Sequence, residues 1–229
     1  MRSHQQSAKH GSAALLAASA LMLPFVASLT AQSSATSTQP APAKTVHQLF
    51  DEDQADLPSP VNGNVSKITG QEYDQRCDQR KNQIRAMFAA GTIKTGEDFY
   101  YASFIYQHGT SPDDYLFAHV LAMDAVVKGY DTAKWIAAAT LDRYLQMIKQ
   151  PQIFGTQYPL DPNAPHPLQD PHRAVLTGRT LDPYNSGLVP DSVRTDFCVP
   201  GIAQQKENVA MFNTNQYPTK TMVAPGCKR

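Results

Sequence analysis

Three residues of this chain have side chains suited to acid–base chemistry and substrate binding: His108, Asp142 and Arg143. Histidine titrates near neutral pH, so His108 can act as a general base. A carboxylate within hydrogen-bond reach would orient its imidazole ring, and we assign that role to Asp142. The guanidinium of Arg143 would then contact a small polar substrate. This combination is typical of a hydrolase or a transferase.

The same three residues also have a structural interpretation. His108 ends a helical pattern, and a partly positive imidazole is stabilised at the negative end of a helix. Asp142 and Arg143 occur among apolar residues of another helix, where a buried charge needs a partner. A salt bridge to the C-terminal part of the chain would supply that partner. We favour this interpretation because the sequence places no partner beside His108.

Five more polar residues form a candidate ligand-binding group: Gln152, Thr156, Gln157, Asp191 and Arg194. Gly155 lies among the first three and permits the positive φ of a sharp turn. The amides can satisfy the free carbonyls of a helix end, or they can bind a small polar ligand. Asp191 and Arg194 stand one helical turn apart, so they either clamp the structure or line a cleft.

Metal and cofactor sites are not indicated by the motifs. His166 and His172 lie near acidic residues, but their spacing matches neither the helical His pair of zinc proteases nor a zinc finger. The sequence contains no Gly-rich phosphate loop, no Gly-x-Ser-x-Gly elbow and no Ser-x-x-Lys motif. We therefore expect no metal and no cofactor.

Residues 1–31 have the features of a signal peptide. Arg2 and Lys9 precede an apolar run from Ala13 to Leu29, which Pro24 interrupts. We therefore expect a periplasmic or secreted protein with no integral membrane span after signal removal. An uncleaved N-terminal anchor helix is the alternative. Residues 32–65 are rich in Ser, Thr, Ala, Pro and Gln and are expected to form a disordered linker.

Charge and cysteine content narrow the partners and the compartment. The chain has 20 basic and 20 acidic residues, a balance that argues against a nucleic-acid partner. Export implies an oxidising compartment, in which disulfides persist. Cys198 and Cys227 lie in turn-prone sequence and are the candidate pair, closing a loop of about 30 residues. Cys77 lies in a predicted helix and is expected to be a small buried hydrophobic residue.

Helical spacing, caps and glycine stops predict four helices, over residues 71–90, 95–109, 111–129 and 131–151, and a short fifth over 202–213. Thr95 begins the second with a capping box, and Ser111 begins the third with Pro112 after it. The third helix carries an apolar series at helical spacing: Leu116, Val120, Met123 and Val127.

The short connections between these helices favour antiparallel neighbours. We therefore predict a mainly α fold, an antiparallel helical-hairpin stack of about four helices plus the short C-terminal helix. It forms a single domain over residues 66–213. This domain includes an irregular Pro-rich segment, 158–200, and a turn-rich tail follows at 214–229.

Several short motifs together resemble a bacterial family of domains of unknown function, number 6624 in that series. They are Tyr106-Gln107-His108-Gly109, Leu141-Asp142-Arg143, Gln152 with Gly155-Thr156-Gln157, and Pro190-Asp191 with Arg194, Val199-Pro200 and Ala203-Gln204. The resemblance spans roughly residues 71–213, and it implies a mostly helical domain with no assigned activity. Residues 102–129 are more weakly similar to one Sel1-type or tetratricopeptide-type helical repeat.

From these features we expect an exported helical domain that binds a protein, peptide or glycan partner without catalysing a reaction. The alternative is the hydrolase or transferase in which His108 and Asp142 act on a small polar substrate.

Overall fold

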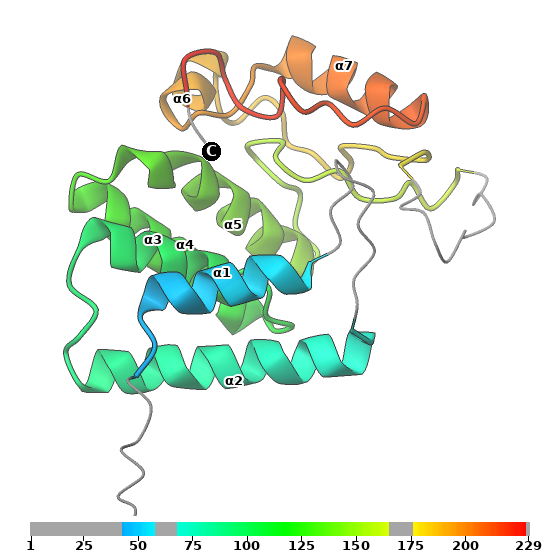
Figure 1. Cartoon of the computed structure of the whole chain (residues 1–229). Helices are drawn as coiled ribbons and strands as arrows, with labels where there is room; N and C mark the ends of the chain where they lie inside the picture. Colours follow the sequence, from blue (N-terminus) through cyan, green and yellow to red (C-terminus); the bar gives the residue numbers. More distant parts are fainter. Residues whose placement is uncertain (1–42, 58–67, 165–175, 228–229) are drawn as a thin grey trace, which may run out of the picture. The chain divides into compact units, whose positions relative to one another are not determined.

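The computed structural model describes residues 43–57, 68–164 and 176–227, all of them within one compact unit, Pro42–Arg229 (Figure 1). The predicted signal peptide, His166 and His172 lie outside the described residues. The described part is mainly helical, which confirms the predicted fold class. None of its helices is both long and apolar enough to cross a membrane.

The described elements begin with α1 (Val46–Asp56), α2 (Gly70–Ala89), α3 (Gly96–Tyr106) and α4 (Pro112–Val127). A short 3-10 helix, η1 (Asp131–Ala133), leads into α5 (Lys134–Met147), and α6 (Asp191–Asp196) and α7 (Ile202–Asn213) complete the series. The predicted caps of α3 and α4 are confirmed. Thr95 and Asp98 form a capping box on α3, and Ser111 and Asp114 form one on α4.

Part of the hydrophobic core lies where α4 packs against both α3 and α5. The face of α4 that makes these contacts is lined with small or branched apolar residues, Ala118, Leu121, Ala122 and Ala125. Small side chains let helices approach closely, so the three helices form a tight layer. The predicted apolar series of α4 lies on its other side: Val120 and Val127 are exposed.

Residues 32–65 are not a disordered linker throughout, and this prediction was wrong for the part that forms α1. Thr45 caps α1 in a capping box with Gln48, and Leu49 is fully buried. His47 stacks on the ring of Tyr101 in α3, with ring centroids 4.3 Å apart. These local signals lie inside a segment whose average composition is that of a linker, which is why composition alone misjudged it.

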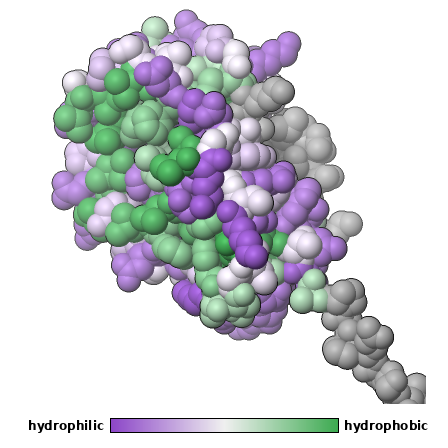
Figure 2. All heavy atoms as spheres, turned by 90° about the vertical axis from the view of Figure 1, so that its left-hand side faces the viewer, coloured by the Kyte–Doolittle hydropathy of each residue, from purple (hydrophilic) through white to green (hydrophobic). Residues whose placement is uncertain are grey.

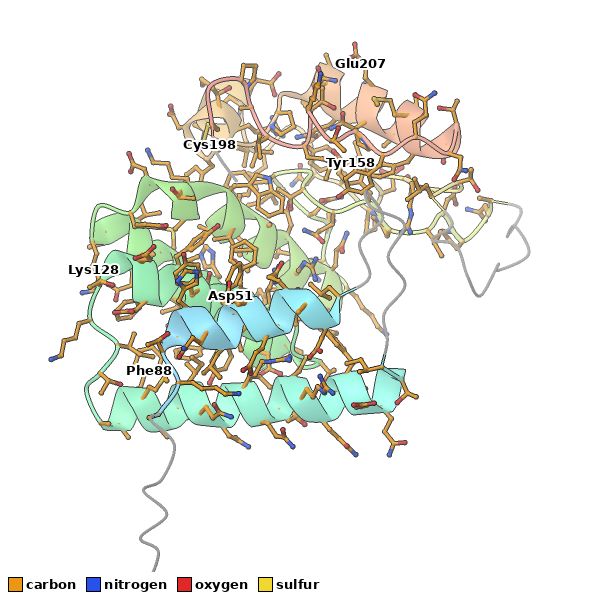
Figure 3. All side chains as sticks on the ribbon, in the orientation of Figure 1. Asp51, Phe88, Lys128, Tyr158, Cys198 and Glu207 are labelled. Carbon is orange, nitrogen blue, oxygen red and sulfur yellow. A yellow bond between two sulfur atoms is a disulfide. The ribbon has the colours of Figure 1, made fainter. Side chains whose placement is uncertain are left out.

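The C-terminal part lies over α5 and is tied together by a disulfide (Figure 1, Figure 3). Cys198, which directly follows α6, is bonded to Cys227, as predicted. The Ala224 backbone amide donates to the Cys198 carbonyl at 2.9 Å, and Trp135 of α5 donates from Nε1 to the Met222 carbonyl at 3.2 Å. The tail therefore packs on the helical layer. Residues 176–190 are irregular as predicted, whereas the short helix α6 was not expected within 158–200.

One buried ion pair connects α2 to α4. The Lys81 ammonium lies 2.9 Å from Oδ2 of Asp114, and both side chains are buried. The same carboxylate accepts hydrogen bonds from the backbone amides of Thr110 and Ser111. A Cβ atom at Gly109 would lie 2.4 Å from the Asp114 side chain, so glycine is required there. Burial raises the pKa of Asp114, but the bonds from Lys81 and Ser111 outweigh it, and the pKa is lowered overall.

We expect the substitution Asp114→Asn to make stability less dependent on pH in acid. Because the folded pKa of Asp114 is lowered, its carboxylate stabilises the fold above the unfolded value of about 3.9, and this contribution is lost as the pH falls through the folded value. The variant should be about 2 kcal/mol less stable at pH 7, and the difference should shrink below about pH 4. Urea denaturation at several pH values measures both. A difference that stays constant down to about pH 2 would contradict the assignment.

Candidate functional site

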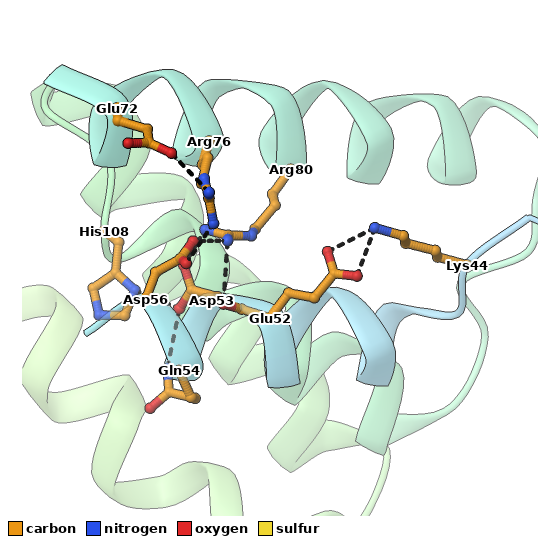
Figure 4. A network of polar contacts seen from close by, with 9 residues as sticks. All are labelled: Lys44, Glu52, Asp53, Gln54, Asp56, Glu72, Arg76, Arg80 and His108. Carbon is orange, nitrogen blue, oxygen red and sulfur yellow. Dashed lines mark hydrogen bonds and ion pairs between the residues drawn. The ribbon is translucent and has the colours of Figure 1, made fainter. Parts of the chain in front are cut away.

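A buried charge cluster joins α1 to α2 and to the end of α3. It consists of Asp53, Asp56, Arg76, Arg80 and His108 (Figure 4). Asp53 and Asp56 lie one turn apart on α1, and Arg76 and Arg80 lie one turn apart on α2. Because residues three or four apart share a helix face, these side chains meet between the two helices, where Arg80 contacts both carboxylates and Arg76 contacts Asp56.

Arg80 is the centre of this charge cluster. Its buried guanidinium lies 3.3 Å from Oδ1 of Asp53, binds Oδ2 of Asp56, and donates to the Glu52 carbonyl at 3.2 Å. Two carboxylates on one guanidinium leave an excess negative charge, which a second cation must offset. Arg76 supplies it, donating to Asp56 at 2.8 Å and to Glu72 at 2.7 Å.

His108 enters the charge cluster from the residues that follow α3. Its Nδ1 lies 2.7 Å from Oδ2 of Asp53, and Gln54 donates to the same oxygen at 3.0 Å. Asp53 is fully buried, so its contacts with Arg80 and His108 satisfy a carboxylate that water does not reach. The carboxylate that holds the imidazole of His108 is therefore Asp53. The predicted pairing of His108 with Asp142 was wrong.

Tyr73 and Cys77 lie beside the charge cluster on the same helix. Burial, together with the negative charge of Asp53, raises the pKa of Tyr73. Burial also raises the pKa of the Cys77 thiol. Since the thiolate is the nucleophilic form, a raised pKa makes Cys77 a poor nucleophile near neutral pH. Its burial agrees with the predicted role of a small hydrophobic residue.

A groove runs between α1 and α2 next to the charge cluster; we call it the α1–α2 groove. Its first part has a volume of 580 Å³ and is mainly apolar, with Val46, Ala86, Met87 and Ala90 among its lining residues. Its second part has a volume of 360 Å³ and is polar, with Glu52, Asp56, Arg76 and Arg80 in its lining. Lys44 and Gln83 line both parts, so the two hollows adjoin.

Asp142 is fully buried and holds a turn of the chain that follows α5. One carboxylate oxygen accepts from the amides of Ile153 and Phe154, at 2.8 and 3.0 Å. The other accepts from the amide and the hydroxyl of Thr156, at 2.9 and 2.8 Å. Burial raises the pKa of Asp142, and these four bonds oppose that rise. The predicted clamp to the C-terminal part exists, but it consists of hydrogen bonds to Asp142 and not of a salt bridge.

Gln152 and Gln157 continue this turn. The buried Gln152 amide donates to the carbonyls of Gln157 and Leu181, and its oxygen accepts from the Gln157 amide at 3.0 Å. Gln157 donates from Nε2 to the Ala139 carbonyl of α5 at 3.3 Å. The side-chain donors of both residues therefore bind backbone carbonyls of the protein itself, which agrees with their structural interpretation and not with ligand binding.

Arg194 is buried against the same turn. It donates to the carbonyls of Phe154, Ile153 and Ser186, and it contacts Asp191 at 3.0 Å. Gln205 of α7 also donates to the Phe154 carbonyl, at 2.7 Å. Gly155 has a φ of +82°, as its predicted role requires, and a Cβ atom there would lie 2.2 Å from Gln205. Asp191 and Arg194 thus form the structural clamp and not an open cleft.

Arg143 contacts the chain beside His108. Its Nη1 donates to the Gln107 carbonyl at 3.5 Å, a long bond. The structure thus separates the predicted residues into two groups. His108 belongs to the charge cluster, whereas Asp142, Gln152, Thr156, Gln157, Asp191 and Arg194 belong to the turn after α5.

The α1 side of the charge cluster was missed by the sequence analysis. Asp53 and Asp56 fell within the predicted linker, so Arg76 and Arg80 had no visible partners. Two signals were available: the Thr45-x-x-Gln48 capping box, and carboxylates spaced three apart that match guanidiniums spaced four apart. Among the described residues, no group of three or more His, Cys, Asp or Glu side chains is arranged to hold a metal ion.

Comparisons with known proteins do not assign the chain to a family. No protein-family model matches the chain, and no similar curated protein or solved structure was found. The resemblance to family 6624 therefore stays a prediction.

Removing Arg80 should destabilise the fold far more than removing Arg76. Arg80→Met leaves the carboxylates of Asp53 and Asp56 buried without the cation that binds them both. This should lower the free energy of unfolding by about 3 to 5 kcal/mol. Arg76 has a side chain that is 42 % exposed, so Arg76→Met should cost under about 1 kcal/mol. Urea denaturation of the two variants at neutral pH compares the same substitution on the same helix. Equal losses would show that Arg80 is not the centre of the cluster.

Proposed function

We propose that the chain is a binding protein that takes a short peptide segment into the α1–α2 groove. The observation that supports this proposal most directly is the pair of adjoining hollows between α1 and α2, one mainly apolar and one polar. Their volumes lie in the range typical of ligand sites in proteins. Two helices that carry a groove along their length suit an elongated ligand better than a compact one.

The lining of the groove specifies the chemistry of the peptide. At the apolar end, Met87 offers a flexible side chain that adapts to different apolar groups. At the polar end, three cations, Lys44, Arg76 and Arg80, stand against two carboxylates, Glu52 and Asp56. Arg76 and Arg80 are also paired with Glu72 and Asp53, so the cation that can leave its partner for a ligand carboxylate is the exposed Lys44. The ligand we propose therefore has an apolar side chain close to an acidic residue or to a C-terminal carboxylate.

The exposed ion pair at the boundary of the two hollows can exchange partners. Lys44 and Glu52 lie 2.5 Å apart, and both side chains are about half exposed. A surface pair of this kind contributes little to stability, so Lys44 can rotate to meet a ligand carboxylate at low cost. The buried Arg80, by contrast, is held by Asp53 and Asp56, so its position at the polar end of the groove is fixed.

We also propose that this binding takes place outside the cytoplasm, in the periplasm or in the medium. The Cys198–Cys227 disulfide supports this, because such bonds persist in oxidising compartments. The N-terminal sequence supports it independently through the pattern of a signal peptide. The membership of family 6624 and the antiparallel arrangement of the helical hairpins are parts of the same proposal. They rest on the quoted motifs and on the short connections between helices.

The groove can be tested with labelled tetrapeptides that place Leu or Phe before Asp or Glu. Ala86→Trp fills the apolar hollow and should weaken binding at least tenfold in fluorescence anisotropy. Ala89→Trp is the matched control, because Ala89 is exposed on the same helix and does not line the groove. Lys44→Glu should weaken acidic peptides about tenfold and leave neutral ones unchanged. Equal binding by Ala86→Trp and Ala89→Trp would refute the groove as the site.

A second function, hydrolysis or group transfer on a small polar substrate, is favoured by one observation. His108 is bound at Nδ1 by the buried carboxylate of Asp53, the orientation that a general base needs. Asp53 here takes the role that the sequence analysis gave to Asp142.

If His108 is a general base, His108→Gln should lower the turnover of p-nitrophenyl acetate by about 100-fold or more while the chain stays folded. Circular dichroism checks the fold, and the Lys44→Glu variant controls for changes in the groove. Turnover that is equal in the wild type and in His108→Gln would eliminate this function. Peptide binding should be unchanged by His108→Gln, so the two functions are tested separately.

A further inference from the structure

The outer face of α4 carries a row of large apolar side chains, most of which remain exposed in the described part of the chain. Leu116, Val120 and Val127 are 38 %, 51 % and 79 % exposed, and Phe117 beside them is 37 % exposed. Met123 completes the row; it is partly buried because it also packs against the core. Figure 2 shows hydrophobic residues gathered on the side of the molecule that carries Lys128, the residue that follows α4 (Figure 3). Several large apolar side chains that are exposed together on one helix face indicate an interaction surface.

The packing of α4 explains why this row is free. The helix contacts α3 and α5 through Ala118, Ala122 and Ala125, which lie on the side opposite to the row. The residues of the row recur at intervals of four, three and four, which keeps them on one stripe along the helix. α4 therefore has two apolar sides, and the described residues pack mainly on one of them.

We propose that this stripe binds the same stripe on a second copy of the chain, with the two α4 helices antiparallel. In that arrangement Leu116 of one copy meets Val127 of the other, and Val120 meets Met123. The spacing makes this possible because the order of the residues is symmetric about the middle of the helix, between Leu121 and Ala122. A surface that is complementary to itself gives a closed two-fold dimer.

The charges at the ends of α4 match this pairing. Asp113, in the first turn, and Lys128, which follows the last turn, lie on the same flank of the stripe at helical spacing. A two-fold axis between antiparallel helices brings equivalent flanks together, so Asp113 of each copy lies near Lys128 of the other. Both residues are exposed in the single chain. The Lys128 ammonium makes a long contact to Asp124, at 3.9 Å, and lies 5.0 Å from the ring centroid of Phe99, both of them weak surface contacts. The dimer thus gains two ion pairs. A parallel two-fold pair would place the two equivalent flanks on opposite sides, so that Asp113 and Lys128 could not meet.

The size of the stripe implies a dimer of modest affinity. The 16 residues of α4 extend about 24 Å, and one helix pair alone buries less area than a typical stable interface. We therefore expect a monomer–dimer equilibrium at micromolar concentrations. The groove residues lie on α1, α2 and the start of α3, so dimerisation leaves the α1–α2 groove open.

The first experiment measures the mass of the purified chain in solution by sedimentation equilibrium over about 5 to 500 µM, a range that spans the expected affinity. The wild type should shift from monomer to dimer, and Val120→Glu should weaken the dimer at least 100-fold. Leu188→Glu is the matched control. Leu188 is 60 % exposed and lies outside α4, so this variant should dimerise like the wild type. Circular dichroism confirms that each variant keeps its helices.

The second experiment exchanges the charges and identifies the antiparallel arrangement. Asp113→Lys and Lys128→Asp should each weaken the homodimer about tenfold, because each places like charges opposite each other. An equimolar mixture of the two variants should form a heterodimer as tight as the wild-type dimer, since one ion pair then keeps its native sense and the other is restored with its charges exchanged. A structural effect of either substitution on the single chain would not be repaired by mixing.

Three results would overturn the proposal. The chain could stay monomeric at every concentration, or its dimer could be unaffected by Val120→Glu, or mixing could fail to restore affinity. The same variants also test whether the stripe binds a lipid surface instead of a second copy. A monomer that binds phosphatidylcholine–phosphatidylglycerol vesicles and loses this binding in Val120→Glu would assign the stripe to lipid and exclude the dimer.

Discussion

The buried carboxylate of Asp142 is the interaction on which the C-terminal third of the molecule depends. It gathers three backbone amides and one hydroxyl from the chain between Ile153 and Thr156, and so fixes a turn directly after α5. With its amides turned inward, the turn presents the carbonyls of Ile153 and Phe154 to the other side. Arg194, Gln205 and Tyr184 donate to these carbonyls. The irregular segment and α7 are thus built on a turn that one side chain of the helical layer holds.

Asp142 and the charge cluster offset the cost of burying charge in different ways. The described hydrogen-bond partners of Asp142 are four neutral donors, over which its charge is spread. Asp53 and Asp56 instead share the guanidinium of Arg80, with Arg76 and His108 at the margin. The first arrangement shapes one short turn, where backbone donors are close in sequence. The second joins three separate helices, because long cationic side chains reach across the space between them.

The local parts of this fold were predictable from sequence, because their signals are local. The capping boxes of α3 and α4, the bounds of α7 and the positive φ of Gly155 each follow from a few neighbouring residues. Partners distant in sequence were not predictable. The partner of His108 lies 55 residues away, on a helix that average composition had hidden. The stripe on α4 illustrates the same limit: periodicity predicts that a helix has an apolar side, but not whether that side faces inward or outward.

The two proposed surfaces lie on different elements, and this separation has a functional consequence. The α1–α2 groove uses no residue of α4, and the stripe on α4 uses no residue that lines the groove. A dimer through α4 would therefore carry two open grooves on one particle. Two linked sites bind a partner with repeated segments more tightly than one site does, because the second contact is made at a high effective concentration. Weak recognition in each groove would then suffice for firm attachment to a repetitive partner, while single free peptides would still dissociate quickly.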